Sequence, residues 1–130
     1  MRHALAVALV LASCSGTPTP GTSCNSTDLA CLNGQNQAVC VNRVWVSVGC
    51  EGANGCKDGA GQVSCDVSVG TAGKACPPWA EGAAACQLFP PAVVVCRSGV
   101  WAVDHTCAQC SPNASSPVCT GGSTGGGSAT

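Results

Sequence analysis

Thirteen cysteines in a chain of 130 residues constrain the fold of this sequence more than any other feature. Such a density is typical of a disulfide scaffold, and disulfides persist in oxidising compartments. Large apolar residues are sparse: between Cys24 and Cys119, only 21 of 96 residues are Val, Leu, Trp or Phe. Because so small a core rarely offsets the entropy of ordering the chain, we expect cross-links worth ~2–4 kcal/mol each to be the main stabilising term.

The cysteines indicate an internal duplication, since twelve of them fall into two sets of six with similar spacing. The first set is Cys24, Cys31, Cys40, Cys50, Cys56 and Cys65, and the second is Cys76, Cys86, Cys96, Cys107, Cys110 and Cys119. Trp45 and Trp101 occupy matching places in the two sets. The sequence therefore predicts a small, disulfide-rich, mainly β protein. It should consist of two tandem Cys-rich β-hairpin mini-domains, with little or no helix outside the signal segment.

Each predicted hairpin has two Val-rich strands around a two-residue turn. In the first repeat the strands are Ala38–Val41 and Val44–Val48, around Asn42-Arg43. In the second repeat they are Val93–Arg97 and Val100–Val103, around Ser98-Gly99. A further strand pair is expected around Gly59-Ala60-Gly61.

The predicted boundaries follow the cysteines. We expect the first repeat over 24–66, a linker over 67–75 and the second repeat over 76–119. The segment 14–23 has no large apolar residue and is predicted to be a mobile tether, and 120–130 is predicted to be a disordered tail.

Residues 1–13 are typical of a secretion signal, because an apolar run over Ala4–Ala12 follows a weakly positive start. The end of this run, Leu11-Ala12-Ser13-Cys14, resembles the lipobox of bacterial lipoproteins, in which the Cys becomes the lipidated first residue. Ordinary signal cleavage after Ala12 is the alternative. Cysteine arithmetic favours the lipobox, since setting Cys14 aside leaves an even number that can all pair. By resemblance to Gram-negative sorting rules, Ser15 directs such a lipoprotein to the outer membrane.

One feature of the spacing predicts local disulfides. Eight residues separate Cys56 from Cys65, with turn residues midway, so a hairpin would place the two directly opposite each other. Opposed positions lie near the separation that a disulfide needs, and this predicts Cys56–Cys65 and, by the same spacing, Cys110–Cys119. Three pairings remain open for the other four cysteines of each repeat. We favour Cys24–Cys40 with Cys31–Cys50, and Cys76–Cys96 with Cys86–Cys107.

Trp45 and Trp101 are the candidate ligand-binding residues. A Cys, a short turn, a Trp and a closing Cys resemble small chitin-binding modules, in which an aromatic ring stacks on a sugar face. The alternative, which we favour, is that each Trp is the largest core residue of its repeat and covers a disulfide.

His105, Cys107 and Cys110 form an H-x-C-x-x-C motif, which can hold zinc or carry redox chemistry. The favoured alternative is that both cysteines are cross-linked and His105 is an exposed loop residue. The first repeat has Val48 at the place of the His. The carboxylates lie in polar or Gly-rich surroundings, so we expect no catalytic residue, no metal, no cofactor and no enzyme activity.

Charge is sparse, with a net charge of −1. A nucleic-acid partner is therefore not expected.

The overall pattern resembles Cys-rich repeat lipoproteins of the myxobacterial type. The likeness is carried by Gly49–Cys56, Val63–Asp66, Gly73–Cys76 and Val95–Trp101, and it covers most of Cys24–Cys119. That group has no established activity. The resemblance implies an exported outer-membrane lipoprotein on the periplasmic or cell-surface face. Our own leading interpretation is that the protein is held by a lipid anchor and acts as a binding or structural-interaction module towards an unknown protein or polysaccharide. Carbohydrate binding through the two Trp faces is the alternative.

Overall fold

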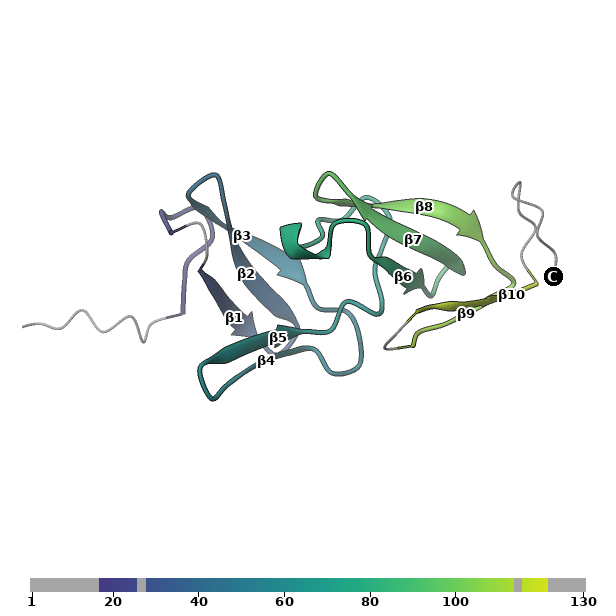
Figure 1. Cartoon of the computed structure of the whole chain (residues 1–130), viewed down its shortest axis with the longest axis horizontal. Coiled ribbons are helices and arrows are strands. Elements are labelled where there is room, and N and C mark those ends of the chain that lie inside the picture. Colours follow the sequence, from purple (N-terminus) through teal and green to yellow (C-terminus); the bar gives the residue numbers. More distant parts are fainter. Residues whose placement is uncertain (1–16, 26–27, 114–115, 122–130) are drawn as a thin grey trace, which may run out of the picture.

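The computed structural model describes residues 17–25, 28–113 and 116–121. These residues form ten β-strands and one short 3-10 helix, and every strand pair within the sheets is antiparallel. The chain is thus a small, disulfide-rich, mainly β protein, as predicted from its cysteines. Figure 1 shows an elongated molecule in which β1–β5 occupy one half and β6–β10 the other.

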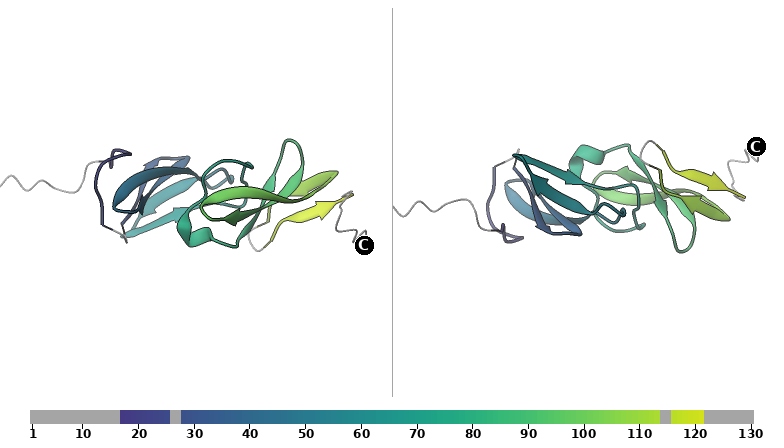
Figure 2. Two further views of the ribbon diagram at one scale, coloured as in Figure 1. Left: turned by 90° about the horizontal axis from the view of Figure 1, so that it is seen from above. Right: turned by 90° about the horizontal axis from the view of Figure 1, so that it is seen from below.

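The two halves repeat one architecture, a three-stranded sheet followed by a separate two-stranded hairpin. The first half contains β1 (Leu29–Asn33), β2 (Asn36–Val41), β3 (Val44–Gly49), β4 (Cys56–Gly59) and β5 (Gln62–Cys65). The second half contains β6 (Ala84–Gln87), β7 (Ala92–Arg97), β8 (Val100–Thr106), β9 (Gln109–Ser111) and β10 (Val118–Thr120). The helix η1 (Pro78–Ala80) precedes β6. The two views in Figure 2 show the halves following one another along the long axis.

The predicted hairpins are β2–β3 and β7–β8. The turn residues Asn42 and Arg43 have φ values of 51° and 64°, and Ser98 and Gly99 have values of 53° and 79°. Two consecutive positive φ values match the right-handed twist of the flanking strands, so such turns close tight hairpins. The edge strands β1 and β6 were not predicted from the sequence, since Leu29–Asn33 and Ala84–Gln87 have no strong β-prone run.

The segment before the first cysteine of each repeat pairs with the strand that carries the Trp. The backbone N–H of Gly21 donates to the carbonyl of Trp45 at 2.8 Å, and Gly73 donates to Trp101 in the same way at 2.8 Å. Both glycines have positive φ, 92° and 88°, which glycine adopts at little cost. Each repeat therefore begins upstream of its first cysteine.

This pairing corrects two predictions. The sequence predicts a mobile tether over 14–23 and a linker over 67–75, but residues 19–23 and 71–75 are hydrogen-bonded into the fold. Both segments match a pattern T-x-G-x-x-C, as Thr19–Cys24 and Thr71–Cys76. That shared pattern is the sequence signal for these elements.

All twelve cysteines in the described part of the chain are in disulfides, and the connectivity is the same in both repeats. The first repeat has Cys24–Cys40, Cys31–Cys56 and Cys50–Cys65, and the second has Cys76–Cys96, Cys86–Cys110 and Cys107–Cys119. No disulfide joins the repeats among these twelve. Six disulfides are consistent with an exported protein.

The predicted pairings are confirmed for Cys24–Cys40 and Cys76–Cys96 and wrong for the others. Cys56 does lie opposite Cys65 in β4–β5, and Cys110 opposite Cys119 in β9–β10, as the spacing predicts. Their sulfurs nevertheless join other cysteines, so Cys56–Cys65, Cys110–Cys119, Cys31–Cys50 and Cys86–Cys107 do not form. The reason is that β4 and β5 pack on β1, so the sulfurs on the packed face find partners outside the hairpin.

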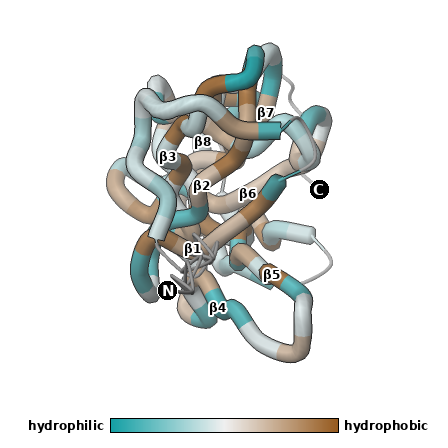
Figure 3. Tube along the Cα trace, turned by 90° about the vertical axis from the view of Figure 1, so that its left-hand side faces the viewer, coloured by the Kyte–Doolittle hydropathy of each residue, from teal (hydrophilic) through white to brown (hydrophobic). Residues whose placement is uncertain are grey.

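The largest core cluster lies in the second repeat. It consists of the buried residues Cys76, Ala80, Ala85, Val94, Cys96 and Trp101. In the first repeat the buried apolar residues are Ala38, Val39, Val48, Cys50 and Cys56. Figure 3, seen from the left-hand side of Figure 1, shows hydrophilic colours along β4, whose non-cysteine residues are exposed. The hairpin thus contributes little apolar surface and is attached mainly through its cysteines.

The repeats contact each other through polar side chains. Gln37 on β2 is only 1% exposed, and its Oε1 accepts a hydrogen bond from Nε1 of Trp79 at 3.0 Å. Glu51 accepts from the hydroxyl of Thr71 at 2.9 Å and lies 3.8 Å from Nζ of Lys74. Because Trp79, Thr71 and Lys74 belong to the second repeat, these contacts fix the position of one half against the other.

Candidate functional site

Trp45 and Trp101, equivalent in sequence, lie in different environments. Trp101 is 1% exposed and packs in the second-repeat core. Gly70 lies directly on its ring, because a Cβ there would come within 2.7 Å of Cε2 of Trp101. Nε1 of Trp101 has no hydrogen-bond partner among the described residues. The ring of Trp101 is covered by its own chain and presents no face for a sugar, which rules out Trp101 as a ligand-binding residue.

Trp45 is only half-buried and lines the wall of an open groove of about 650 Å³. The other lining residues are Ser23, Cys24, Asn25, Asp28 and Arg43. The groove therefore combines an aromatic ring with a guanidinium, a carboxylate and an amide. Residue 18, which corresponds to Gly70 by the spacing of the first cysteines, is Pro. The first repeat thus lacks the glycine that lets the chain cover Trp101.

An exposed apolar turn joins β6 to β7. Phe89 at this turn is 89% exposed and Leu88 is 39% exposed. The buried side chain of Gln87 fixes the turn through two hydrogen bonds. Its Nε2 donates to the carbonyl of Pro90 at 2.9 Å, and its Oε1 accepts from the N–H of Ala72 at 2.9 Å. We call residues 88–91 the apolar tip. Figure 1 places the β6–β7 connection in the half of the molecule distant from residue 17.

The corresponding turn of the first repeat is polar. Residues Asn33–Asn36 join β1 to β2 there, and the side chain of Asn33 accepts hydrogen bonds from Gln35 and Asn36. The carbonyl of Gly34 accepts from the N–H of Cys56 at 2.9 Å. The apolar tip therefore belongs to the second repeat alone and is not a requirement of the shared fold.

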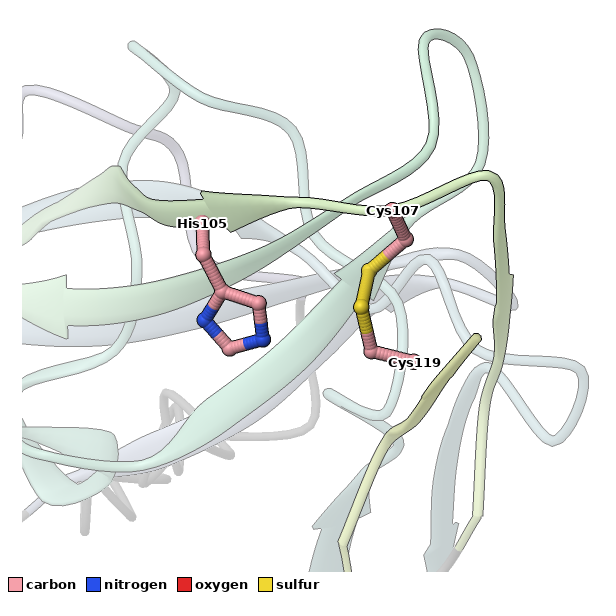
Figure 4. A group of neighbouring side chains, drawn as sticks. All are labelled: His105, Cys107 and Cys119. Carbon is pink, nitrogen blue, oxygen red and sulfur yellow. A yellow bond between two sulfur atoms is a disulfide. The ribbon is translucent and has the colours of Figure 1, made fainter. Parts of the chain in front are cut away.

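The H-x-C-x-x-C motif is divided by the fold. Cys110 is bound to Cys86 and buried, so it lies in a different disulfide from Cys107. His105 instead lies beside Cys107–Cys119, and one ring nitrogen and the two sulfurs lie within 4.8 Å of one another (Figure 4). Nδ1 of His105 lies 2.7 Å from a carboxylate oxygen of Asp104. With the disulfide closed, the sulfurs are not thiolates, the form in which cysteine binds metal.

Asp66 organises the loop between the two repeats. Its carboxylate accepts hydrogen bonds from the N–H groups of Asn54 and Ser68, both at 3.0 Å. Partial burial raises the pKa of Asp66, but the hydrogen bonds from Ser68 and Asn54 outweigh it and leave that pKa below its ordinary value. A Cβ at Gly52 would collide with this carboxylate, so a larger residue there would displace the Asp66 side chain from these hydrogen bonds.

Cys14, the predicted lipidation residue, lies outside the described residues. No helix in the part of the chain that the structure describes is long and apolar enough to cross a membrane.

Comparison of the chain with protein-family models, with curated proteins and with solved structures finds no match.

Proposed function

We propose that the protein is an exported lipoprotein that serves as a rigid interaction module and binds a partner protein through the apolar tip. The observation that carries this proposal is Phe89, which is 89% exposed on a turn fixed by the buried Gln87. A large apolar ring exposed to water gains free energy when a partner covers it, at about 25 cal/mol per Å² of buried apolar surface. Holding the backbone of the turn in place beforehand lowers the entropy cost of that binding.

The arrangement of the molecule supports this role. Six disulfides make the body resistant to unfolding outside the cytoplasm. A lipid on Cys14 would attach the chain at the N-terminal side, and the apolar tip lies in the half distant from residue 17 (Figure 1). Such a protein would present the tip away from the membrane surface. The resemblance to Cys-rich repeat lipoproteins points in the same direction.

Site-specific photo-crosslinking in the producing cell tests the proposal. A photoreactive residue is placed at Leu88 or Phe89, and at Gln35 in the corresponding turn of the first repeat as the matched control. We expect one discrete adduct from the tip positions and none from Gln35. The purified protein of that adduct should then bind the unmodified chain in solution, and Phe89→Ser should weaken binding at least tenfold while the melting temperature stays unchanged.

The same adduct from Gln35, or equal binding by the Phe89→Ser variant, would show that the tip is not the contact surface. Absence of any adduct from both tip positions would also contradict the proposal. Crosslinks to lipid instead of protein would assign the tip to a membrane surface.

The groove at Trp45 supports a second candidate function, the binding of a polysaccharide. The specific observation is the conjunction of a half-buried aromatic ring with the polar side chains of Asn25, Asp28 and Arg43 around one groove. Aromatic faces stack on sugars while such groups bind hydroxyls. Binding to insoluble chitin, peptidoglycan and cellulose should be saturable for one of them, and Trp45→Ala should abolish it in a folded protein. No saturable binding to any polymer on a glycan array would eliminate this function.

A further inference from the structure

The disulfide Cys107–Cys119 lies beside an imidazole, and its counterpart in the first repeat does not. In Figure 4 the ring of His105 lies alongside the two sulfur atoms, with one nitrogen on the side facing them and the other turned away. The equivalent disulfide is Cys50–Cys65, and the equivalent of His105 there is Val48. Val48 is 3% exposed and apolar, so it can donate no proton.

An insertion in the second repeat positions this imidazole. Val94 pairs with Val103 and Val93 pairs with His105, so Asp104 is an extra residue that forms a β-bulge in β8. The first repeat has no such insertion, since Ala38 pairs with Ser47 and Gln37 with Val48. Bulges bend a strand locally and redirect its side chains, and they occur often beside functional sites.

The inserted residue also holds the ring. Oδ2 of Asp104 lies 2.7 Å from Nδ1 of His105, where it can accept a proton from Nδ1, and Nε2 is the ring nitrogen on the side of the disulfide. Oδ1 of the same carboxylate accepts a hydrogen bond from Arg97 at 3.4 Å. Arg97, Asp104 and His105 thus form a chain of polar groups that ends at the two sulfurs.

We propose that Cys107–Cys119 is a thiol–disulfide exchange site, in which His105 donates a proton to the sulfur that leaves. The substrate class is a dithiol, either a small molecule or a pair of cysteines on another protein. Exchange proceeds through attack of a thiolate on a disulfide sulfur, and its rate depends on the stability of the leaving thiolate. A positioned acid at the leaving sulfur contributes directly to that step.

One thiolate of the dithiol attacks one sulfur of Cys107–Cys119, the S–S bond breaks, and the other sulfur leaves and takes the Nε2 proton of the His105 imidazolium, which becomes a neutral imidazole. The second thiol of the dithiol then passes its proton to Nε2 and attacks the mixed disulfide, and the remaining cysteine leaves and takes that proton. The dithiol is oxidised to a disulfide, and Cys107 and Cys119 are reduced to two thiols.

Opening this disulfide leaves the rest of the fold connected. Strand β9 stays attached because Cys110 remains bound to Cys86 in the core. Strand β10 then keeps its three paired residues with β9, the hydrogen bond from Ala108 to Thr120 and the one from the Thr120 hydroxyl to the carbonyl of Gln109. Reduction would therefore release one terminal strand, and the body of the protein would tolerate repeated exchange.

Reduction of each disulfide by dithiothreitol, followed by rapid alkylation and peptide mass spectrometry, tests the proposal on the full chain. Cys24–Cys40 is the internal control, because both of its cysteines are also partly exposed and no His among the described residues lies beside it. We expect Cys107–Cys119 to react at least about tenfold faster than this control, a threshold set below the ~10²–10⁴-fold that general acid catalysis typically contributes. His105→Val copies the first repeat, and it should remove most of that difference, as should His105→Gln. Asp104→Asn should give an intermediate rate.

Thermal melting of the oxidised variants distinguishes loss of the acid from destabilisation of the fold. A substitution that merely loosened β8 would expose the disulfide and accelerate its reduction, whereas loss of the acid slows it. The proposal is wrong if Cys107–Cys119 reacts no faster than Cys24–Cys40. It is also wrong if both His105 variants keep or exceed the wild-type rate.

Discussion

The two tryptophans show how one residue type in one sequence context takes two roles. Trp101 lies in the core because Gly70 lets the preceding chain cover its ring, while Trp45 stays half-buried at a groove. The sequence places both side chains on equivalent strands. It does not predict the difference, because the covering residues come from the segment before each repeat.

Truncation of each Trp should therefore have unequal effects. Trp101→Ala removes the largest buried side chain and should lower the free energy of unfolding by about 3–5 kcal/mol. Trp45→Ala should cost less than half of that, because part of the ring already faces solvent. Denaturant titration with the disulfides intact measures both. Equal losses in the two variants would contradict the environments described above.

Asp66 makes the stability of the fold depend on pH. Its folded-state pKa is lowered, so the carboxylate stabilises the fold at every pH above its unfolded pKa of about 3.9. That contribution is lost as the pH falls through the lower folded value. Asp66→Asn should thus be less stable than the wild type at pH 7, and the difference should shrink below about pH 4.

Stability curves from pH 2 to pH 8 provide the measurement. Asp58→Asn is the matched control, since Asp58 is an exposed carboxylate on the neighbouring strand β4. A constant difference between the Asp66→Asn variant and the wild type across this range would show that the hydrogen bonds to Asn54 and Ser68 do not favour the charged form.

At the scale of elements, each repeat attaches a two-stranded hairpin to a three-stranded sheet. An isolated hairpin is at best marginally stable in water. β4–β5 is attached by Cys31–Cys56 and Cys50–Cys65, and β9–β10 by Cys86–Cys110 and Cys107–Cys119. Disulfides within the hairpins would have left each hairpin joined to its sheet through the backbone, without a disulfide between them.

The attachment predicts a local effect of removing one disulfide. Replacing Cys31 and Cys56 together by Ala should free the start of β4 and make Lys57 a preferred site of trypsin cleavage. Removing Cys24–Cys40 instead should leave Lys57 protected, because that bond lies elsewhere in the repeat. Limited proteolysis with peptide identification would show it. Equal cleavage at Lys57 in the two variants would mean that β4 is held by other contacts.

The register of β4–β5 could be predicted from the sequence, but its disulfides could not. Spacing and turn residues place Cys56 opposite Cys65, and that pairing is observed. The partner of each sulfur depends on which face of the hairpin meets β1, and no local residue specifies that face.

The docking of Thr19–Cys24 could have been predicted by aligning it with Thr71–Cys76. The sequence also indicates the bulge at Asp104, because the second repeat has one residue more than the first between its Trp and its fourth cysteine.

At the scale of the whole molecule, the proposed lipid anchor determines where the body is held. A bacterial lipoprotein carries two or more acyl chains on its cysteine, and two chains suffice for stable anchoring where one does not. Cys14→Ser should therefore move the protein from the membrane to the soluble fraction, with its signal segment processed differently. Unchanged membrane fractionation and processing of this variant would contradict the lipobox interpretation.

The separation of the disulfides into two closed sets has a consequence for how the chain matures. Twelve cysteines joined at random allow about 10⁴ pairings, whereas six allow only fifteen. No disulfide of the described residues crosses from one repeat to the other, and the contacts between repeats are the non-covalent ones of Gln37 and Glu51. An exported chain that emerges from its N-terminus can complete the first set before the second is present. Oxidation can thus proceed as two small searches in succession, and the first repeat, once closed, offers no free thiol with which the second could pair wrongly.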